Sequence, residues 1–361
     1  MERMTRKRFV ILGLSLVTVA LLLSALSHPA IYPAKLSSIV NIGDDSIDTA
    51  LDKNIDANVG TSLDEPEDAP VEVKSAPTKQ EDWTPKTFPA PEKKVLDMIK
   101  TNVMNDSKDK ILLTAVVNSG MADYTLNWIE SLKKCNLENH FLVFAIDDEL
   151  VVQLTEAGYG AHVVKIPDDW FHKKLSGDFA SWKVGDYTPI THSKSLVVER
   201  LLYLDITVWF SDVDIVFTNP SIYHYLLLKL KSRKDAKTKQ ELTEVLFTQE
   251  LEQRLINSGF YLMRPTNTNK RIIADSIDIQ DKEPQVTQQT AMNRILDDMD
   301  LGYHSSPIAL LDLALFPHGR YYFENKVPTK FEMTPMMVHA NYRQGQEKKA
   351  SLQEAGLWYL Q

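Results

Sequence analysis

Apolar segments alternate with amphipathic segments along the middle of the chain. Three short apolar runs are typical of buried strands: 110–117, 141–146 and 161–166. Between and after them, apolar residues recur at helical spacing in three segments: 124–134, 149–157 and 193–204. This alternation predicts an α/β fold, with a mostly parallel, Rossmann-like sheet flanked by helices on both faces. Ligands bind such sheets beyond the carboxyl ends of the strands.

The apolar, β-branched stretch 204–217 is interrupted by two aspartates. Asp212 and Asp214 bracket Val213 and directly follow Ser211. The apolar residues on both sides predict a buried strand, where a carboxylate is costly unless it is paired or binds a metal. Two carboxylates at this spacing can face one hard cation, and oxygen ligands suit Mg²⁺ or Mn²⁺ together with substrate phosphates. The pattern predicts a metal clamp, with a solvated surface turn as the alternative.

A second candidate ligand lies near the carboxyl end of the chain. The apolar run 336–338 ends at His339, and a neutral imidazole is a suitable third ligand for a divalent metal. The loop that follows contains Gly345, which allows a tight backbone turn near phosphate. Its basic side chains are candidates to meet diphosphate charge: Arg343, Lys348 and Lys349. The alternative is a core histidine that precedes a solvated helix.

The first 94 residues differ in composition from the rest. Basic residues dominate 1–8, and the uncharged run 9–26 approaches the length that spans a bilayer. The positive-inside rule then predicts a cytosolic tail at 1–8 and a transmembrane signal-anchor at 9–26. A cleaved signal peptide is the alternative, but the apolar run is longer than a usual signal core. Segment 27–94 is acidic in its middle and lacks apolar periodicity, which predicts a flexible stem before a single domain at 95–361.

Composition narrows the function classes. The chain has 361 residues and a net charge of −9, so no basic excess supports binding to nucleic acid. The single cysteine, Cys135, excludes an intramolecular disulfide and is predicted to be a buried thiol. Asn105 begins an Asn-Asp-Ser sequon in a polar segment, which predicts N-glycosylation if this part of the chain is lumenal.

Several short blocks together resemble the nucleotide-diphospho-sugar transferase family, which includes plant rhamnogalacturonan xylosyltransferases and extensin arabinosyltransferases. The blocks occur in family order across 110–360: Val116-Val117-Asn118 with Asn127-Trp128, Ser211-Asp212-Val213-Asp214, Asn257-Ser258-Gly259-Phe260, Gln289 with Asn293, Phe316-Pro317-His318-Gly319, and His339-Ala340-Asn341 with Gly345 and Lys348. There are two departures. Gln288-Gln289 stands where the family often has Asp-Gln, and the family's acidic residue before the Asn-x-Gly block is not obvious near 247–250.

The resemblance implies a GT-A fold and a glycosyltransferase activity. It implies a nucleotide-diphosphate sugar donor such as a UDP-sugar, a glycan or glycoprotein acceptor, a divalent metal (usually Mn²⁺) and retention of anomeric configuration. It also implies a single-pass type II membrane protein of the Golgi with a lumenal catalytic domain. That location agrees with the anchor and stem predicted independently from the first 94 residues.

The same resemblance suggests a role for each candidate site residue. Asp212, Asp214 and His339 would hold the metal that neutralises the leaving diphosphate. The candidates for contact with the nucleotide sugar are Thr114, Val117 and Asn118 for the nucleoside, Lys194, Lys348 and Gly345 for phosphate, Asn257 and Gln289 for the sugar, and Ser211 and Val213 beside the clamp. Two carboxylates, Asp147 and Glu250, remain open as catalytic groups.

Two other functions compete with this interpretation. Residues 212–216 also fit the Asp-x-Asp signature of haloacid-dehalogenase-type phosphatases, in which Asp212 would attack phosphorus. Those phosphatases carry the motif on their first strand, whereas three strand–helix candidates precede it here. The other competitor is a non-catalytic, membrane-tethered sugar-binding protein. The aromatic segment 167–191 could serve as a lid or acceptor platform, or could simply pack on the domain.

Overall fold

The computed structural model describes five stretches of the chain: 83–106, 108–171, 187–251, 254–301 and 307–360. The predicted cytosolic tail, the anchor, most of the stem and most of the aromatic segment 167–191 lie outside these stretches. Within the stretches, none of the helices combines the length and the apolar character needed to cross a bilayer.

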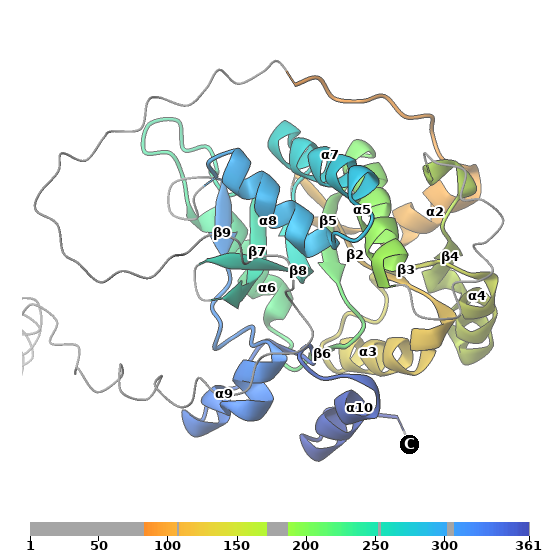
Figure 1. The fold of residues 1–361 in the computed structure, drawn as a ribbon, viewed down its shortest axis with the longest axis vertical. Coiled ribbons are helices and arrows are strands. Elements are labelled where there is room, and N and C mark those ends of the chain that lie inside the picture. Colours follow the sequence, from red (N-terminus) through yellow and green to blue (C-terminus); the bar gives the residue numbers. More distant parts are fainter. Residues whose placement is uncertain (1–82, 107, 172–186, 252–253, 302–306, 361) are drawn as a thin grey trace, which may run out of the picture. The chain divides into compact units, whose positions relative to one another are not determined.

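The main sheet runs through the middle of the domain (Figure 1). Its strands are β1 (Met104–Asp106), β2 (Asp109–Val117), β3 (Phe141–Ala145), β4 (Val163–Lys165), β5 (Thr207–Ser211), β7 (Val245–Leu251), β8 (Leu255–Met263) and β9 (Ile308–Leu310). The order is β4-β3-β2-β5-β8-β7-β9, with β1 paired to β2. Strands β2 to β5 are parallel, β8 is antiparallel to both β5 and β7, and β9 is parallel to β7. The predicted α/β class is therefore confirmed, and the sheet is mixed.

Helices cover both faces of this sheet. They are α2 (Lys93–Asn102), α3 (Ala122–Lys134), α4 (Asp148–Leu154), α5 (Tyr187–Tyr203), α6 (Ile222–Ser232), α7 (Asn267–Lys282) and α8 (Gln288–Asp298). Two further helices, α9 (Val327–Lys330) and α10 (Gly345–Glu354), follow, and Leu352 of α10 belongs to a separate small core. Alternate residues of each strand point to opposite faces. Leu112 and Val116 thus join a core with α2, α5, α7 and α8, while Ile111 and Leu113 join one with α3, α4 and α6.

The apolar flanks of 204–217 suggested a single strand, but the stretch forms two strands. Strand β5 ends at Ser211, where the Asp212 N–H donates to the Gly259 carbonyl at 2.7 Å. The chain then turns, and β6 (Ile215–Phe217) pairs with β10 (Met337–His339) in a separate antiparallel sheet. The two aspartates therefore lie in a turn between two sheets, because each apolar half of the stretch belongs to a different sheet.

The end of the predicted stem contacts the domain. Lys86 Nζ lies 3.0 Å from Glu199 Oε1 on α5. The Phe88 ring packs edge-on against Tyr203 and lies 3.7 Å from the Arg200 guanidinium. The segment 83–92 thus rests on the outside of α5, although its sequence has no apolar period.

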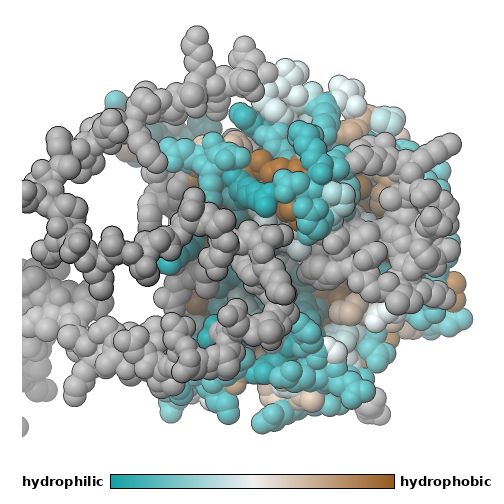
Figure 2. All heavy atoms as spheres, viewed as in Figure 1, coloured by the Kyte–Doolittle hydropathy of each residue, from teal (hydrophilic) through white to brown (hydrophobic). Residues whose placement is uncertain are grey.

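The surface seen in Figure 2 is largely hydrophilic where residues are described, and its hydrophobic areas are small. Scattered exposed apolar residues of this kind are ordinary for a globular domain. Cys135 is buried, which confirms its prediction, and burial raises the pKa of its thiol to about 11. Asn105 is exposed on β1 rather than in a loop.

Candidate active site

Three candidate metal ligands meet at one edge of the main sheet. Asp212 follows the carboxyl end of β5, and Asp214 lies two residues further along the same turn. His339 ends β10 and pairs with Ile215 across the small sheet. One ligand atom from each of the three side chains lies within 4.8 Å of the other two. His339 is thus carried by the small antiparallel sheet rather than by the main sheet.

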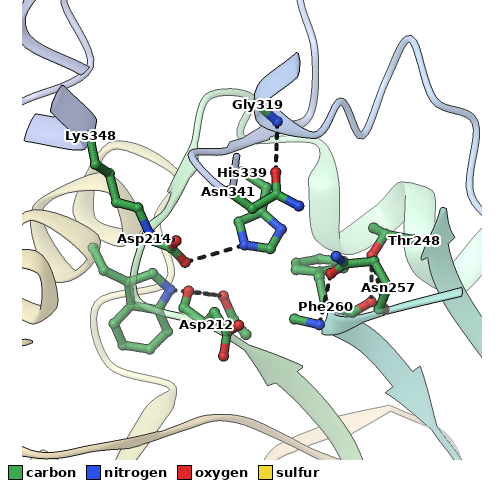
Figure 3. A network of polar contacts seen from close by, with 12 residues as sticks. Asp212, Asp214, Thr248, Asn257, Phe260, Gly319, His339, Asn341 and Lys348 are labelled. Atoms are coloured by element: carbon green, nitrogen blue, oxygen red, sulfur yellow. Dashed lines mark hydrogen bonds and ion pairs between the residues drawn. The ribbon is translucent and has the colours of Figure 1, made fainter. Parts of the chain in front are cut away.

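Two lysines also enter this cluster. Figure 3 shows Asp214 between Lys348 and His339. Lys348 Nζ donates to Asp214 Oδ2 at 2.6 Å, and His339 Nε2 lies 3.3 Å from Asp214 Oδ1. Lys194 Nζ, from α5, donates to Asp212 Oδ1 at 2.5 Å. We call these five residues the metal-site cluster, in which each carboxylate already faces a cation.

The charges of the cluster support one another. Burial alone would raise the pKa of Asp214, but His339 and Lys348 outweigh this cost and hold the pKa well below its usual range. Burial likewise disfavours the charged Lys348, yet the Asp214 carboxylate raises the pKa of that lysine overall. Asp214 is therefore ionised and Lys348 protonated at neutral pH.

The donor set fits a divalent cation. Ionised carboxylates and an imidazole nitrogen suit Mn²⁺ or Mg²⁺. Room beside them depends on Gly259: a Cβ at this position would lie 2.6 Å from His339 Cε1 and 2.8 Å from Asp212 Oδ2. Sequence reasoning placed Gly259 in a family block but gave it no role. The sequence feature that could have indicated this role is a glycine directly after the polar residues Asn257 and Ser258.

The residues that flank the clamp hold the turn. Ser211 Oγ accepts from Trp128 Nε1 at 3.0 Å and donates to the Asp212 carbonyl. Val213 is buried in the core on the α3 side. Both side chains are thus engaged within the protein rather than at the edge where a ligand would bind.

The predicted nucleoside contacts lie at different depths along β2. Thr114 is fully buried in mid-strand and its hydroxyl donates to the Leu142 carbonyl at 2.7 Å. Val117 is the buried last residue of β2, and the half-buried Asn118 follows it. Because β2 and β5 are parallel neighbours, Asn118 and Asp212 emerge at the same edge of the sheet.

The two predicted sugar-binding amides approach the cluster from β8 and α8. Asn257 Oδ1 accepts from the Gly259 N–H at 2.8 Å, and Gln289 Oε1 accepts from the Ser258 N–H at 3.2 Å. Asn293 instead bonds to both the N–H and the carbonyl of Ile256, which anchors α8 on β8. The Asn–Ser–Gly segment is thus held from two sides.

The basic side chains of the loop after His339 have different partners. Gly345 has a φ of +51°, so the left-handed turn expected of it is present at the start of α10. Lys348 reaches the cluster, but Arg343 Nη1 donates to Glu347 at 2.5 Å and Lys349 lies 3.3 Å from Asp123. Arg343 and Lys349 thus pair with acidic side chains outside the cluster, and a diphosphate role for them stays a prediction.

The structure distinguishes Asp147 from Glu250, the two carboxylates that the sequence left as candidate catalytic groups. Asp147 accepts from the Leu150 N–H at 2.8 Å and the Ser119 N–H at 2.9 Å, so it caps α4 and holds the segment that follows β2. Glu250 instead accepts a hydrogen bond from Asn257 Nδ2, next to the metal-site cluster.

Comparisons with known proteins agree with this geometry. A family model described as nucleotide-diphospho-sugar transferase matches residues 136–353. The chain is 26% identical over 309 residues to a Dictyostelium discoideum protein named UDP-galactose:fucoside alpha-3-galactosyltransferase. That match covers 74% of this chain and 45% of the relative, so the chain spans less than half of the relative's length.

Two of the solved structures that the chain resembles are glycosyltransferases by name. The glycosyltransferase GlyE of Streptococcus pneumoniae shares 13% identity with a TM-score of 0.43, over 70% of this chain and 61% of that one. The galactosyltransferase LgtC, solved with donor and acceptor sugar analogues, shares 12% identity with a TM-score of 0.38, over 69% and 97%. At such TM-scores these similarities support no inference of their own.

Proposed function

Because the chain belongs to the nucleotide-diphospho-sugar transferase family, we propose that it is a metal-dependent glycosyltransferase. The observation that carries this proposal is the convergence of Asp212, Asp214 and His339 at the edge of the sheet. Family membership favours a transferase over the phosphatase that the Asp-x-Asp motif alone allowed. The close approach of Gly259 to His339 and Asp212, where a Cβ would overlap both side chains, favours a working site over a non-catalytic sugar-binding protein.

Each group in the cluster has a part in the proposed reaction. Asp212, Asp214 and His339 would hold Mn²⁺ or Mg²⁺, which as a Lewis acid would neutralise charge on the leaving diphosphate. Lys348 and Lys194 would exchange their carboxylate contacts for charge-assisted hydrogen bonds to phosphate oxygens. Both ammonium groups are largely screened from water, which strengthens such bonds.

The donor is proposed to be a UDP-sugar. Its nucleoside would lie beside Val117 and Asn118, and its sugar hydroxyls would meet the amides of Asn257 and Gln289. The name of the Dictyostelium relative makes UDP-galactose the first donor to test. Retention of configuration, which the sequence resemblance implies, is part of the proposal.

We also propose the cellular setting that the amino-terminal sequence suggests. The basic residues at 1–8 and the uncharged run 9–26 support a type II signal-anchor, and a transferase of glycans or glycoproteins fits a lumenal domain in the Golgi. Asn105 is exposed, as an N-glycosylation site would need to be.

The test uses the full chain, purified in detergent. UDP release from UDP-galactose and other UDP-sugars is measured with Mn²⁺ and with a chelator. The proposal expects release that requires the metal. Binding of UDP-sugars without turnover would support the sugar-binding alternative, and hydrolysis of a phosphomonoester in place of UDP release would support the phosphatase.

A further inference from the structure

Three polar side chains from distant parts of the chain meet beside the metal-site cluster. Glu250 is the next-to-last residue of β7, Asn257 belongs to β8, and Tyr342 lies in the loop after β10. Glu250 Oε1 accepts a short hydrogen bond from the Tyr342 hydroxyl, and Glu250 Oε2 accepts one from Asn257 Nδ2. Each carboxylate oxygen therefore has a fixed partner and a remaining lone pair.

The backbone is shaped to bring these groups together. The pairing of β7 with β8 shifts register on both sides of Thr248–Gln249, and Glu250 has no ladder partner. Bulges of this kind re-aim a side chain and are common next to active sites. Tyr342 has a φ of +60°, a left-handed conformation that is costly for a bulky residue.

The Tyr342 loop is also pinned from the opposite side. The Gly319 N–H donates to Asn341 Oδ1 at 2.7 Å (Figure 3), and a Cβ on Gly319 would lie 1.9 Å from the Asn341 carbonyl oxygen. Only glycine permits this approach. The loop that carries Tyr342 is therefore held in place by contacts separate from Glu250.

Stability alone does not account for this arrangement. Tyr342 is 47% exposed and Glu250 is half-buried, and hydrogen bonds at such exposed positions contribute little to folding. A strained residue that gains so little from its contact indicates a functional constraint. Burial and the hydrogen bond to Glu250 both raise the pKa of Tyr342, so its hydroxyl stays protonated and continues to donate.

The location relates this group to the donor site. Asn257 bonds to Glu250 with its amide nitrogen and to the Gly259 N–H with its amide oxygen. The position of a Cβ on Gly259 would be within 2.9 Å of Asn257 Oδ1, Asp212 Oδ2 and His339 Cε1. Asn257 thus lies between Glu250 and the metal ligands.

We infer that Glu250 and Tyr342 form the acceptor side of the site, where the Glu250 carboxylate accepts a hydrogen bond from the hydroxyl of a sugar acceptor. This inference rests on the proposed glycosyltransferase function. The Tyr342 hydroxyl orients the carboxylate, and its exposed ring offers an apolar face to the sugar. Glu250 makes no covalent bond to the donor in this role, so it orients the acceptor rather than acting as the nucleophile.

The experiment compares two fates of one donor. A panel of methyl glycosides is first screened for the acceptor to which the unmodified protein transfers the sugar fastest. The full chain in detergent is then assayed with UDP-galactose, Mn²⁺ and that acceptor. Glu250→Gln should raise the KM for that glycoside and lower the ratio of transfer to donor hydrolysis about tenfold or more, since one charge-assisted hydrogen bond is lost. Tyr342→Phe should shift the ratio in the same direction by a smaller factor.

Asp147→Asn is the matched control, because it makes the same carboxylate-to-amide change at a helix cap. It should leave the ratio of transfer to hydrolysis as it is. Equal loss of hydrolysis and transfer in Glu250→Gln would overturn the inference and indicate a nucleophile or a donor contact. Donor hydrolysis by the unmodified protein without transfer to any glycoside would also overturn it. Absence of any UDP release would instead refute the proposed function itself.

Discussion

Two clusters of charged side chains lie at opposite ends of β5 and use similar residue types. The metal-site cluster follows the carboxyl end of the strand. At the amino end, Thr207 donates to Asp109, which also pairs with Arg264. We call the latter the Arg264 cluster, with four members: Asp109, Thr207, Glu241 and Arg264. Composition and burial alone do not tell the two clusters apart.

The difference lies in how completely each cluster is closed. Arg264 contacts Asp109 with two nitrogens, at 2.9 and 3.1 Å, and Glu241 at 2.5 Å. Burial disfavours the charged Arg264, yet these carboxylates raise its pKa overall. In the metal-site cluster Lys194 and Lys348 are point charges that each make a short carboxylate contact, and a Cβ on Gly259 would overlap two of the candidate ligands. Two-pronged pairing indicates a structural role, whereas point charges on carboxylates beside an obligatory glycine indicate a ligand site.

The largest effect on stability is expected at the Arg264 cluster. Asp109→Asn leaves Arg264 buried with less opposite charge, and breaking a buried pair typically costs about 3–5 kcal/mol of unfolding free energy. Denaturant unfolding measures this loss. The exposed pair of Lys282 and Asp278 provides the control, since Asp278→Asn should change stability by no more than about 0.5 kcal/mol. If both substitutions changed the free energy of unfolding by the same small amount, the Arg264 cluster would not have the structural role inferred for it.

Asp212→Asn and Asp214→Asn should each reduce activity strongly while leaving the fold intact. Each removes a metal ligand and a negative charge, so we expect metal-dependent turnover to fall about 10²–10³-fold, as for loss of one transition-state contact. The fold should remain, as judged by circular dichroism and a cooperative thermal transition. Near-normal turnover of both variants with Mn²⁺ would show that the clamp is not the metal site.

A smaller, more specific change is expected at the third ligand. His339→Ala should raise the Mn²⁺ concentration for half-maximal activity roughly 10–100-fold, while both aspartates remain. Lys348→Ala should lower turnover with less effect on the metal requirement, because its proposed contact is with phosphate. Titration of activity with Mn²⁺ separates these effects. Identical metal dependence in His339→Ala and the unmodified protein would argue against the ligand assignment.

The room at Gly259 can be tested directly. The added methyl group of Gly259→Ala would overlap His339 Cε1 and Asp212 Oδ2, and overpacking of this kind costs about 1–3 kcal/mol. We therefore expect Mn²⁺ affinity to fall about tenfold or more. Unchanged Mn²⁺ affinity would mean that the ligand lies elsewhere and would weaken the contrast between the two clusters.

The sequence predicted the local elements well, because these depend on short-range patterns. The apolar runs at 110–117 and 141–146 became β2 and β3. The apolar flanks also identified Asp212 and Asp214. The pattern did not show that β6 leaves the main sheet, because the choice of partner strand depends on β10, far along the chain.

Other parts of the site depend on contacts that no local pattern contains. Glu250 and Asp147 looked equivalent until Tyr342, 92 residues away from Glu250, distinguished them. Lys348 and Lys349 are adjacent, yet helix geometry directs them about 100° apart, so only Lys348 meets Asp214. The value of Gly259 became visible only with its neighbours in place.

The smallest effect is expected where the predicted stem meets the domain. Glu199 is buried and pairs with Lys86, and the Phe88 ring lies against Arg200, so this contact resembles the closed Arg264 cluster in a weaker, half-exposed form. A chain that starts at Glu92 loses both contacts and should unfold about 2–4 °C below one that starts at residue 83, equivalent to about 1 kcal/mol. Differential scanning calorimetry measures the shift. Donor hydrolysis should be similar in the two chains, since the contact lies on the outer face of α5. Equal unfolding temperatures would mean that residues 83–91 contribute nothing to the stability of the domain, as expected for part of the stem.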